Sequence, residues 1–471
     1  MNHRSIFRFL LACFLACDLV QGMAQTSLLQ ITNASQTERG FHLMWKEPSE
    51  DAHYTLQFRD TLGKDLWRVP QLFYPFPTLT NEWTDVAATN ASRFFRVVQV
   101  APAQPGKLIS INAAANYTVQ QLQILFSFAG ITNVNPKYPI RLHKVVYETI
   151  TPLGERTTAS GALCVPVGTG NALPLLSYQH GTITLTNKAP SSMDLQTEIA
   201  VGIAFATSGY AVAVPDFLGL GNSPGLHPYH HARSEATACV DMLRSVKTAC
   251  ATNGFPLTNR LFLCGYSQGG HATMALLREL EWFHSNEFTV TACAPMAGAY
   301  DLSGVTAADF LSSRPKPNPY YFLYFLAAYQ EVYELAPSLA DLLVTPYNTN
   351  LPPLLGGNFT GSEINALMPA DPTQILKPEY LADFKTNSHN QLRIALEDND
   401  VHRWKPATPL RFYHCAADQD VIKSNSIVAV SYLQSIGVTN VSLNDPLPLA
   451  GHSDCIQPSL VQARDWFDSL R

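Results

Sequence analysis

The residues best suited to chemistry begin with a serine in a glycine-flanked turn. Residues Gly265–Gly269 read Gly-Tyr-Ser-Gln-Gly, which is the pattern G-x-S-x-G. Glycines two positions before and after the serine permit a sharp strand-to-helix turn that exposes its hydroxyl. The apolar run Leu261 to Cys264 precedes the turn, and a helical pattern over 271–282 follows it. The pattern predicts Ser267 as a nucleophile at a helix N-terminus, where developing negative charge is favoured.

A second G-x-S-x-G match occurs at Gly221–Gly225, centred on Ser223. In such turns the backbone N–H of the residue after the nucleophile stabilises the oxyanion, and Pro224 has no N–H. No apolar strand runs directly into Ser223 either. We therefore interpret Ser223 as a loop residue.

A serine nucleophile needs a base, and the base needs an acid to orient it. The strand-like run Leu410 to Cys415 ends shortly before Asp418, and His452 is the one histidine that follows this aspartate. The chain order serine, aspartate, histidine is that of hydrolases with this kind of turn. Asp418 and His452 are thus the predicted acid and base. Asp420 remains an alternative acid, and Asp454 is disfavoured because it lies beside the histidine.

The oxyanion of an acyl-transfer intermediate needs two backbone N–H donors. The first is predicted to be the N–H of Gln268, which follows the nucleophile. The second is predicted in the loop after the apolar run 175–178, from Gly181 or Thr182, because a glycine lets the backbone approach closely. His180, in the same loop, is expected to form structural hydrogen bonds and not to act as a base.

These residues require a sheet with helices on both faces. Helical patterns cover 232–247 and 271–282. Continuous apolar strands that alternate with helices indicate a mainly parallel sheet, which carries its ligand site at the carboxyl ends of its strands. The predicted strands are 162–165, 175–178, 211–214, 261–264, 292–297, 410–415 and 441–443.

Length and composition limit the other classes. The chain has 471 residues, 46% of them hydrophobic, and a net charge of −6 with no basic stripe. Disorder and nucleic-acid binding are therefore disfavoured. Charged residues are only 14%, against about 25% in an average soluble chain, but no segment after the N-terminus is long and apolar enough for a membrane span.

The first 24 residues resemble a secretion signal. Arg4 and Arg8 precede a short apolar run, and Ala24 ends a small-residue cleavage site. The predicted location is secreted or periplasmic. Lipoprotein processing at Cys13 or Cys17 remains an alternative.

Residues 25–102 differ from the rest of the chain. Short alternating runs separated by turn residues predict a small β-sandwich, which resembles fibronectin type III modules in composition. Trp45, Trp67 and Trp83 fall in this stretch. They are expected to form a sandwich core, with polymer binding as the alternative. Residues 101–106 are a predicted linker to a catalytic region over 107–471.

The catalytic region resembles the α/β-hydrolases, and within them the secretory lipases and esterases. The matching stretches are Tyr178–Thr182, Val214–Gly221 with His227–Tyr229, Gly265–Gly269, the turn at Asp418, and Gly451-His452. The resemblance implies carboxylic ester hydrolysis by a triad of Ser267, His452 and Asp418, and it implies no cofactor. Cys415 departs from the family pattern, in which many members have glycine before the acid turn.

Two structural hypotheses accompany this resemblance. Cys415 and Cys455 flank the acid and base loops, so a disulfide is expected to clamp those loops if the chain is exported. The long stretch between Ala297 and Leu410, at about 300–405, is expected to form a mostly helical cap. Its aromatic segment Tyr320 to Tyr329 either packs inward, onto the sheet or around an acyl chain, or faces a lipid surface.

The predicted function is a secreted serine hydrolase that cleaves esters or lipids through an acyl-enzyme. A serine peptidase, a polyester depolymerase and an inactive binding protein of the same fold are the alternatives. No metal motif is present, and His227, His230 and His231 are interpreted as loop or pocket residues. The oligomeric state is not predicted.

Overall fold

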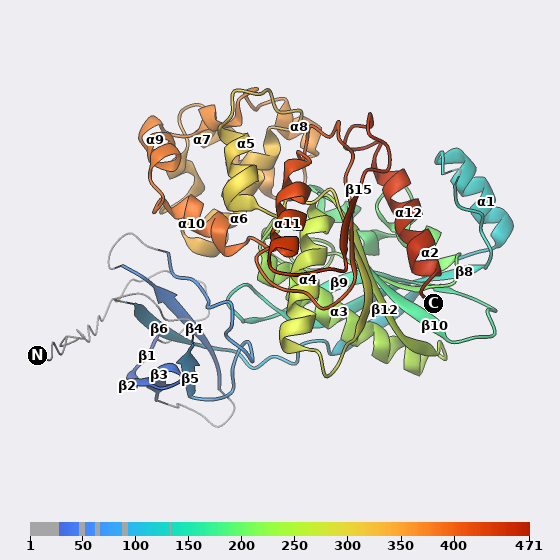
Figure 1. The fold of residues 1–471 in the computed structure, drawn as a ribbon, viewed down its shortest axis with the longest axis horizontal. Coiled ribbons are helices and arrows are strands. Elements are labelled where there is room, and N and C mark those ends of the chain that lie inside the picture. The colour runs from blue at the N-terminus through green and yellow to red at the C-terminus, as the bar shows by residue number, and fades with distance from the viewer. Residues whose placement is uncertain (1–27, 47–51, 62–65, 87–92, 132) are drawn as a thin grey trace, which may run out of the picture.

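The computed structural model describes residues 28–46, 52–61, 66–86, 93–131 and 133–471 (Figure 1). The predicted secretion signal, with Cys13 and Cys17, lies outside these residues. Among the described helices, none has both the length and the apolar character that crossing a bilayer requires.

The N-terminal part is a small sandwich of two antiparallel three-stranded sheets, as the alternating pattern predicts. In the middle strand of one sheet, every second side chain is buried, which is the period of a strand with one face on a core. One sheet has the order β1 (Leu28–Leu29), β6 (Phe94–Val100), β4 (His53–Arg59), and the other β2 (Ile31–Thr37), β3 (Gly40–Trp45), β5 (Glu82–Asp85).

The tryptophan side chains of the sandwich pack against other residues of the sandwich. Trp45 and Phe73 are buried, and Trp83 packs edge-on against Phe73. Trp67 makes cation–π contacts with the guanidinium groups of Arg59 and Arg96. These contacts favour the core interpretation of the tryptophans over the polymer-binding alternative.

The central sheet has nine strands. Six neighbouring strands run parallel to one another, and the other three form an antiparallel edge. The mainly parallel sheet is confirmed, and the predicted strand 162–165 belongs to the antiparallel edge. In spatial order the strands are β15 (Val441–Asn444), β14 (Leu410–Tyr413), β13 (Val290–Met296), β12 (Leu257–Tyr266), β10 (Leu173–Gln179), β11 (Ala211–Pro215), β9 (Arg156–Pro166), β8 (Ile140–Ile150) and β7 (Leu108–Tyr117).

Helices cover both faces of this sheet, and each face has its own hydrophobic core. One core combines sheet residues with α3 (Ala232–Thr252), α4 (Gln268–Phe283) and α11 (Ser424–Ser435). The other combines them with α1 (Val119–Phe128), α2 (Ile199–Ala206) and α12 (Ile456–Asp468). The strands are apolar on both sides because both sides are covered.

A helical cap lies between β13 and β14 in the chain and has a third core of its own (Figure 1, yellow to orange). The aromatic segment belongs to α6 and faces inward, with Leu323, Leu326 and Tyr329 fully buried. The alternative in which this segment faces a lipid surface is therefore wrong. The cap helices are α5 (Ala307–Leu311), α6 (Tyr320–Tyr333), α7 (Tyr347–Asn350), α8 (Gly361–Asn365), α9 (Pro378–Thr386) and α10 (Gln391–Asp398).

The sandwich packs against the catalytic region through specific contacts. Arg233 of α3 donates hydrogen bonds to the carbonyl oxygens of Pro70, at 2.6 Å, and Gln71, at 3.0 Å. Tyr74 stacks on Phe283 at the end of α4, with ring centroids 4.8 Å apart. The sandwich is thus held against the surface formed by α3 and α4.

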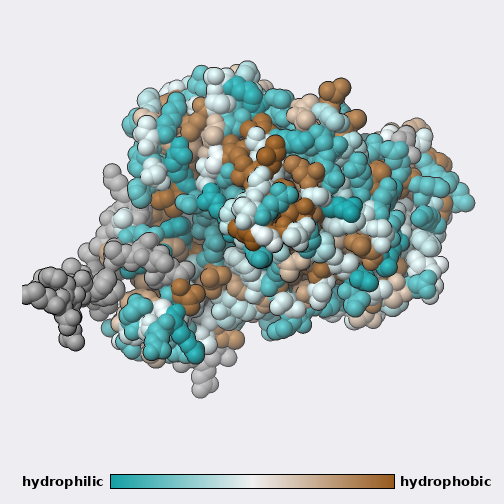
Figure 2. Space-filling model, in the orientation of Figure 1, coloured by the Kyte–Doolittle hydropathy of each residue, from teal (hydrophilic) through white to brown (hydrophobic). Residues whose placement is uncertain are grey.

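The molecular face in Figure 2 is largely hydrophilic despite the low content of charged residues. Hydrophobic residues gather near the centre of this view, around α11, where Ile427 is exposed. The apolar composition is thus mostly taken up by the three cores of the catalytic region.

Candidate active site

Ser267 occupies a strained turn between β12 and α4. Its φ is 59°, a left-handed value that non-glycine residues rarely adopt. The two flanking glycines are required by close packing: a Cβ on Gly265 would lie 2.4 Å from Gly269 O, and one on Gly269 would lie 1.9 Å from Gln179 O. The strand, turn and helix thus have the arrangement that the G-x-S-x-G pattern predicts.

The structure brings the three predicted catalytic residues together. His452 Nε2 lies 2.8 Å from Ser267 Oγ, and His452 Nδ1 lies 2.6 Å from Asp418 Oδ2. Ser267 and His452 are only 8% and 9% exposed, and Asp418 is buried. This geometry lets the imidazole accept the serine proton on one nitrogen while the carboxylate holds the other.

The carboxylate of Asp418 is fixed by four donors. Oδ1 accepts the backbone N–H groups of Asp420 and Val421, at 2.9 and 3.0 Å. Oδ2 faces His452 and also His414 Nε2, at 3.3 Å. Burial alone raises the pKa of Asp418, but the hydrogen bonds from His414 and His452 outweigh it and hold the pKa well below its usual range. The acid is therefore ionised at neutral pH.

The two alternative acids are placed elsewhere. The side chain of Asp420 accepts a hydrogen bond from Asn318 of the cap, at 2.7 Å. Asp454 is exposed to solvent. Neither side chain has a hydrogen bond to His452 in the described part of the chain, so the geometry favours Asp418.

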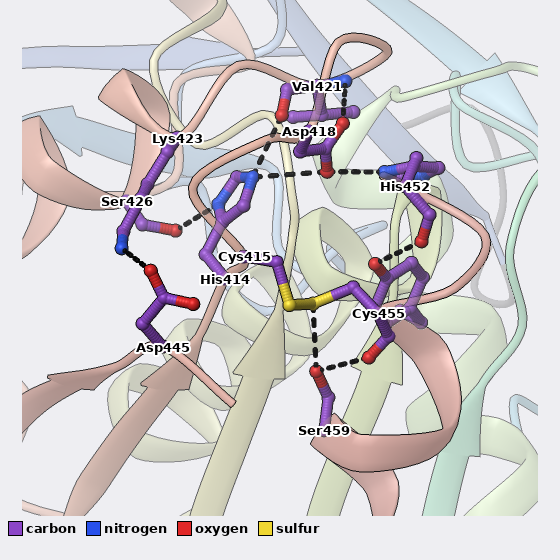
Figure 3. The surroundings of a disulfide bond; sticks show 11 residues. His414, Cys415, Asp418, Val421, Lys423, Ser426, Asp445, His452, Cys455 and Ser459 are labelled. Atoms are coloured by element: carbon purple, nitrogen blue, oxygen red, sulfur yellow. Dashed lines mark hydrogen bonds and ion pairs between the residues drawn. A yellow bond between two sulfur atoms is a disulfide. The ribbon is translucent and has the colours of Figure 1, made fainter. Parts of the chain in front are cut away.

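A disulfide and a tyrosine fix the loop that carries His452. Cys415, just after β14, is bonded to Cys455, just before α12, with their Cα atoms 6.0 Å apart (Figure 3). The hypothesis of a clamp between the acid and base loops is confirmed. Tyr266 adds a hydrogen bond from its hydroxyl to the carbonyl oxygen of His452, at 2.6 Å.

The proposed oxyanion donors lie next to the nucleophile. Gln268 is the first residue of α4, where helix geometry leaves the N–H without an intrahelical acceptor. Gly181 follows β10, and its Cα approaches closely enough that a Cβ there would lie 3.5 Å from Tyr266 O. The hydroxyl of Thr182 lies 2.7 Å from Tyr229 OH, so the backbone N–H of Thr182 is the donor considered for the oxyanion.

The remaining residues of interest in these loops have structural surroundings. The ring nitrogens of His180 lie 2.6 and 3.0 Å from the carbonyl oxygens of Gly181 and Asp216, which agrees with its expected structural role. Ser223 is buried in a loop, with no strand before it and no helix after it. Its Oγ has no hydrogen-bond partner among the described residues, so the expectation that Ser223 is a loop residue is confirmed.

A buried network beneath the nucleophile was not anticipated from the sequence. The carboxylate of Glu235, on α3, accepts hydrogen bonds from Gln268 Nε2, at 2.8 Å, and from His271 Nδ1, at 2.7 Å. Gln268 Nε2 also donates to His227 Nε2, at 2.6 Å. The network ties α3 to the first turn of α4, which carries the proposed oxyanion N–H. The only signal in the sequence is a glutamate near the start of the predicted helix 232–247.

Two groups of residues have spacings that a metal ion would require, namely His230, Glu235 and His271, and Asp301, Asp400 and His402. In the first group, hydrogen bonds take up His271 and Glu235: the two His271 nitrogens are held by Glu235 and by Asn399 O, while His230 Nδ1 has no hydrogen-bond partner among the described residues. In the second, the two carboxylates accept hydrogen bonds from Ser303 and from backbone N–H groups. Both groups fit structural networks better than ligand sets.

The cap is hydrogen-bonded to the loops around the site. Tyr324 of α6 donates to Ile183 O, at 3.2 Å, and its ring stacks on Tyr229. A hollow of about 400 Å³ lies beside these loops. It is bordered by Thr182, Ile183, Thr184, Leu185, Lys188, Gln196, Thr197, Glu198, Val201, Thr360 and Ile456.

A neighbouring hollow of about 290 Å³ lies between α2, α12 and the end of α1. It shares Val201 and Ile456 with the first hollow. Its lining is mainly aliphatic, whereas hydroxyl, amide and charged side chains contribute much of the first lining. The molecule thus offers two neighbouring hollows with mainly apolar surfaces, and the first of them also carries several polar side chains.

Comparisons with known proteins agree with this architecture. Residues 185–278 match the family model of the secretory lipases. No curated protein matches the chain by sequence.

Solved structures extend the likeness to most of the chain. The rice cell wall degrading esterase LipA of Xanthomonas oryzae is 28% identical with a TM-score of 0.71, over 78% of this chain and 100% of LipA. Lipase A of Candida antarctica in its closed state is 15% identical with a TM-score of 0.57, over 77% and 83% of the two chains, and shows the fold alone.

These matches bear out the predicted fold, an α/β-hydrolase sheet with helices on both faces and a small N-terminal β region. The fibronectin-like character of that region stays a prediction. The family model and the LipA structure together support an α/β-hydrolase of the lipase and esterase type, whose activity is ester hydrolysis.

Proposed function

We propose that the protein is a secreted serine esterase that hydrolyses carboxylic esters through an acyl-enzyme on Ser267. The observation that carries the proposal is the continuous contact from Ser267 Oγ through His452 to Asp418, at 2.8 and 2.6 Å. An inactive binding protein of the same fold would have no need to keep this alignment.

The chemistry proceeds in two steps. His452 takes the Ser267 proton as Oγ attacks the ester carbonyl, and the backbone N–H groups of Gln268 and of Gly181 or Thr182 receive the oxyanion. His452 then gives its proton to the leaving alcohol, and the alcohol departs. Water, activated by the same imidazole, releases the acid and restores Ser267. Apart from ester and water, each of these steps uses residues of this chain, so the proposal includes no cofactor.

Export is part of the proposal because three observations point the same way. The N-terminal 24 residues have the pattern of a secretion signal, and the matching family is that of secretory lipases. The disulfide between Cys415 and Cys455 is of the kind that persists in an oxidising compartment.

The main test compares two serines. Ser267→Ala is expected to abolish turnover of p-nitrophenyl butyrate and labelling by a fluorophosphonate. The matched control is Ser223→Ala, since Ser223 occupies the second G-x-S-x-G match and should leave most activity. The reverse result would refute the assignment of the nucleophile.

Substrate class is decided by a panel assayed with the wild-type protein. Short esters, triglyceride emulsions, polyesters and peptides separate an esterase or lipase from a depolymerase or a peptidase. LipA is described as a cell wall degrading esterase, so polysaccharide-linked esters belong in the panel. We expect esters to be hydrolysed and peptides to be left intact.

A further inference from the structure

The catalytic acid lies between two histidines. His452 Nδ1 approaches Asp418 Oδ2 at 2.6 Å, and His414 Nε2 approaches the same oxygen at 3.3 Å. Figure 3 shows the two rings on opposite sides of this oxygen. His414 follows β14 directly and is completely buried. The reaction described above has no step for this second imidazole.

The partners of His414 fix where its proton lies. Nε2 is 2.8 Å from Val421 O, and a carbonyl oxygen can only accept, so Nε2 carries a hydrogen. Nδ1 is 2.7 Å from the hydroxyl of Ser426 on α11, which holds the ring in its plane. The Nε2–H is therefore directed at Val421 O, and Asp418 Oδ2 is a second, longer contact of the same nitrogen at 3.3 Å.

The two oxygens of Asp418 differ in how firmly they are held. Backbone N–H groups of the acid turn hold Oδ1, whereas among the described residues Oδ2 has only the two imidazoles. One of these, His452, must change its protonation state and move slightly with its proton during each turnover. A second donor that does not take part in proton transfer would keep Oδ2 in place throughout the cycle.

We propose that His414 is a positioning residue of the catalytic triad, which holds Asp418 Oδ2 in line with His452 Nδ1. The proposal rests on the esterase function proposed above. His414 touches neither substrate nor Ser267; it acts through Asp418. Its removal should lower kcat with little change in KM, because the alignment matters to proton transfer and not to the binding of the ester.

Two substitutions separate the donor from the ring. His414→Phe keeps a planar ring and removes the donor, whereas His414→Gln places an amide N–H close to the position of Nε2. Initial rates with p-nitrophenyl butyrate are divided by the number of active sites, which is counted by fluorophosphonate labelling. We expect His414→Phe to lower kcat about tenfold with KM within twofold, and His414→Gln to keep at least about half of the wild-type kcat.

His402 supplies the matched control. It is a buried histidine whose Nδ1 lies 2.9 Å from the carbonyl oxygen of Tyr300, and no hydrogen bond joins it to a triad residue among the described ones. His402→Phe is expected to leave kcat per active site unchanged. An equal loss in this variant would show a general effect of buried-histidine replacement and overturn the proposal.

The remaining outcomes are also decisive. A kcat of His414→Phe within twofold of wild type, or an equal loss in His414→Gln, refutes the positioning role. If His414→Phe does not fold, Ser426→Ala decides, since it frees the ring without deleting the donor. That variant should lose kcat about twofold to fourfold at constant KM, and an unchanged kcat would refute the proposal. A wild-type protein without esterase activity would refute the proposed function instead.

Discussion

The active-site end of the sheet and the surface that receives the N-terminal sandwich are built from different kinds of contact. At the active site, a few buried polar groups meet at 2.6 to 2.8 Å, and a disulfide joins the loops that carry them. At the sandwich surface, Arg233 reaches backbone carbonyls and Tyr74 stacks on Phe283. Catalysis at the active-site end depends on the alignment of single groups, whereas the sandwich is held by several separate contacts.

From this difference we expect substitutions at the active site to affect the catalytic rate and substitutions at the sandwich surface to affect the free energy of unfolding. A catalytic group that is misplaced by a fraction of an ångström loses rate steeply. A docking contact that is lost lowers the free energy of unfolding by a modest amount. Active-site variants should therefore stay folded and turn over slowly, and sandwich variants should unfold earlier and turn over normally.

The largest expected effect follows from Asp418→Asn. The amide cannot hold His452 in the tautomer that accepts the serine proton, so kcat should fall about 10⁴-fold. Asp420→Asn, two residues away in the same turn, is the matched control and should show a much smaller loss. Steady-state kinetics with p-nitrophenyl butyrate measure both, and similar losses in the two variants would contradict the choice of Asp418 over Asp420.

The disulfide comes next. Replacing Cys415 and Cys455 together with alanine opens a 40-residue loop, and the free energy of unfolding should fall by about 2–4 kcal/mol. Cys250→Ala is the control, because Cys250 is buried and free. Denaturant unfolding with and without a reducing agent is the measurement. The reducing agent should weaken the wild type and Cys250→Ala but not the double variant.

Lowering the pH should lower the free energy of unfolding through the protonation of Asp418. Its pKa is held below the usual range in the folded protein, so the unfolded chain binds its proton at a higher pH than the folded one. The resulting stability is fully present above the ordinary aspartate pKa of about 3.9 and is lost as pH falls below that value. Thermal unfolding at pH 5 and pH 3 should show a larger decline for wild type than for Asp418→Asn, and equal declines would contradict this account.

At the sandwich surface, Arg233→Met is expected to cost about 1.5–3 kcal/mol, because it removes charge-assisted hydrogen bonds to the carbonyls of Pro70, Gln71 and Phe73. The cation–π contact of Arg233 with Phe76 is lost as well. Activity per active site should stay near the wild-type value. A fall in kcat as large as the one expected for His414→Phe would show that the sandwich shapes the active site after all.

The active-site end was far more predictable from the sequence than the sandwich surface. The nucleophile turn is a local pattern of glycines, and chain order alone left few choices for the acid and base. The role of His414 was not predictable, because it depends on how the turn from Asp418 to Val421 folds back onto the end of β14. The same limit applies to Glu235, whose partners lie on another helix.

The contacts at the sandwich surface could hardly be predicted from the sequence, for a different reason. Pro70 and Gln71 contribute backbone carbonyls to the contact with Arg233, and every residue type has a carbonyl. Two strands of the antiparallel edge, β7 and β8, were also missed. Half of the β7 side chains are exposed, and in the largely buried β8 polar and charged residues interrupt the apolar ones, so neither strand has a continuous apolar run. Patterns of residue type predict elements with continuous apolar runs, and they fail where polar residues interrupt a strand or where the backbone makes the contact.

The smallest effect, from Tyr74→Ala, distinguishes two roles for the sandwich. Stacking on Phe283 and the edge contact with His284 should be worth about 1 kcal/mol. Val86→Ala, at an exposed apolar position of the sandwich, should change stability by less than about 0.5 kcal/mol. Denaturant unfolding and kcat measured on the same samples decide between the roles. If Tyr74→Ala loses stability alone, the sandwich serves as a brace for α3 and α4. If it loses kcat in proportion, the position of α4, and with it the turn at Ser267, depends on a contact at the opposite end of the helix.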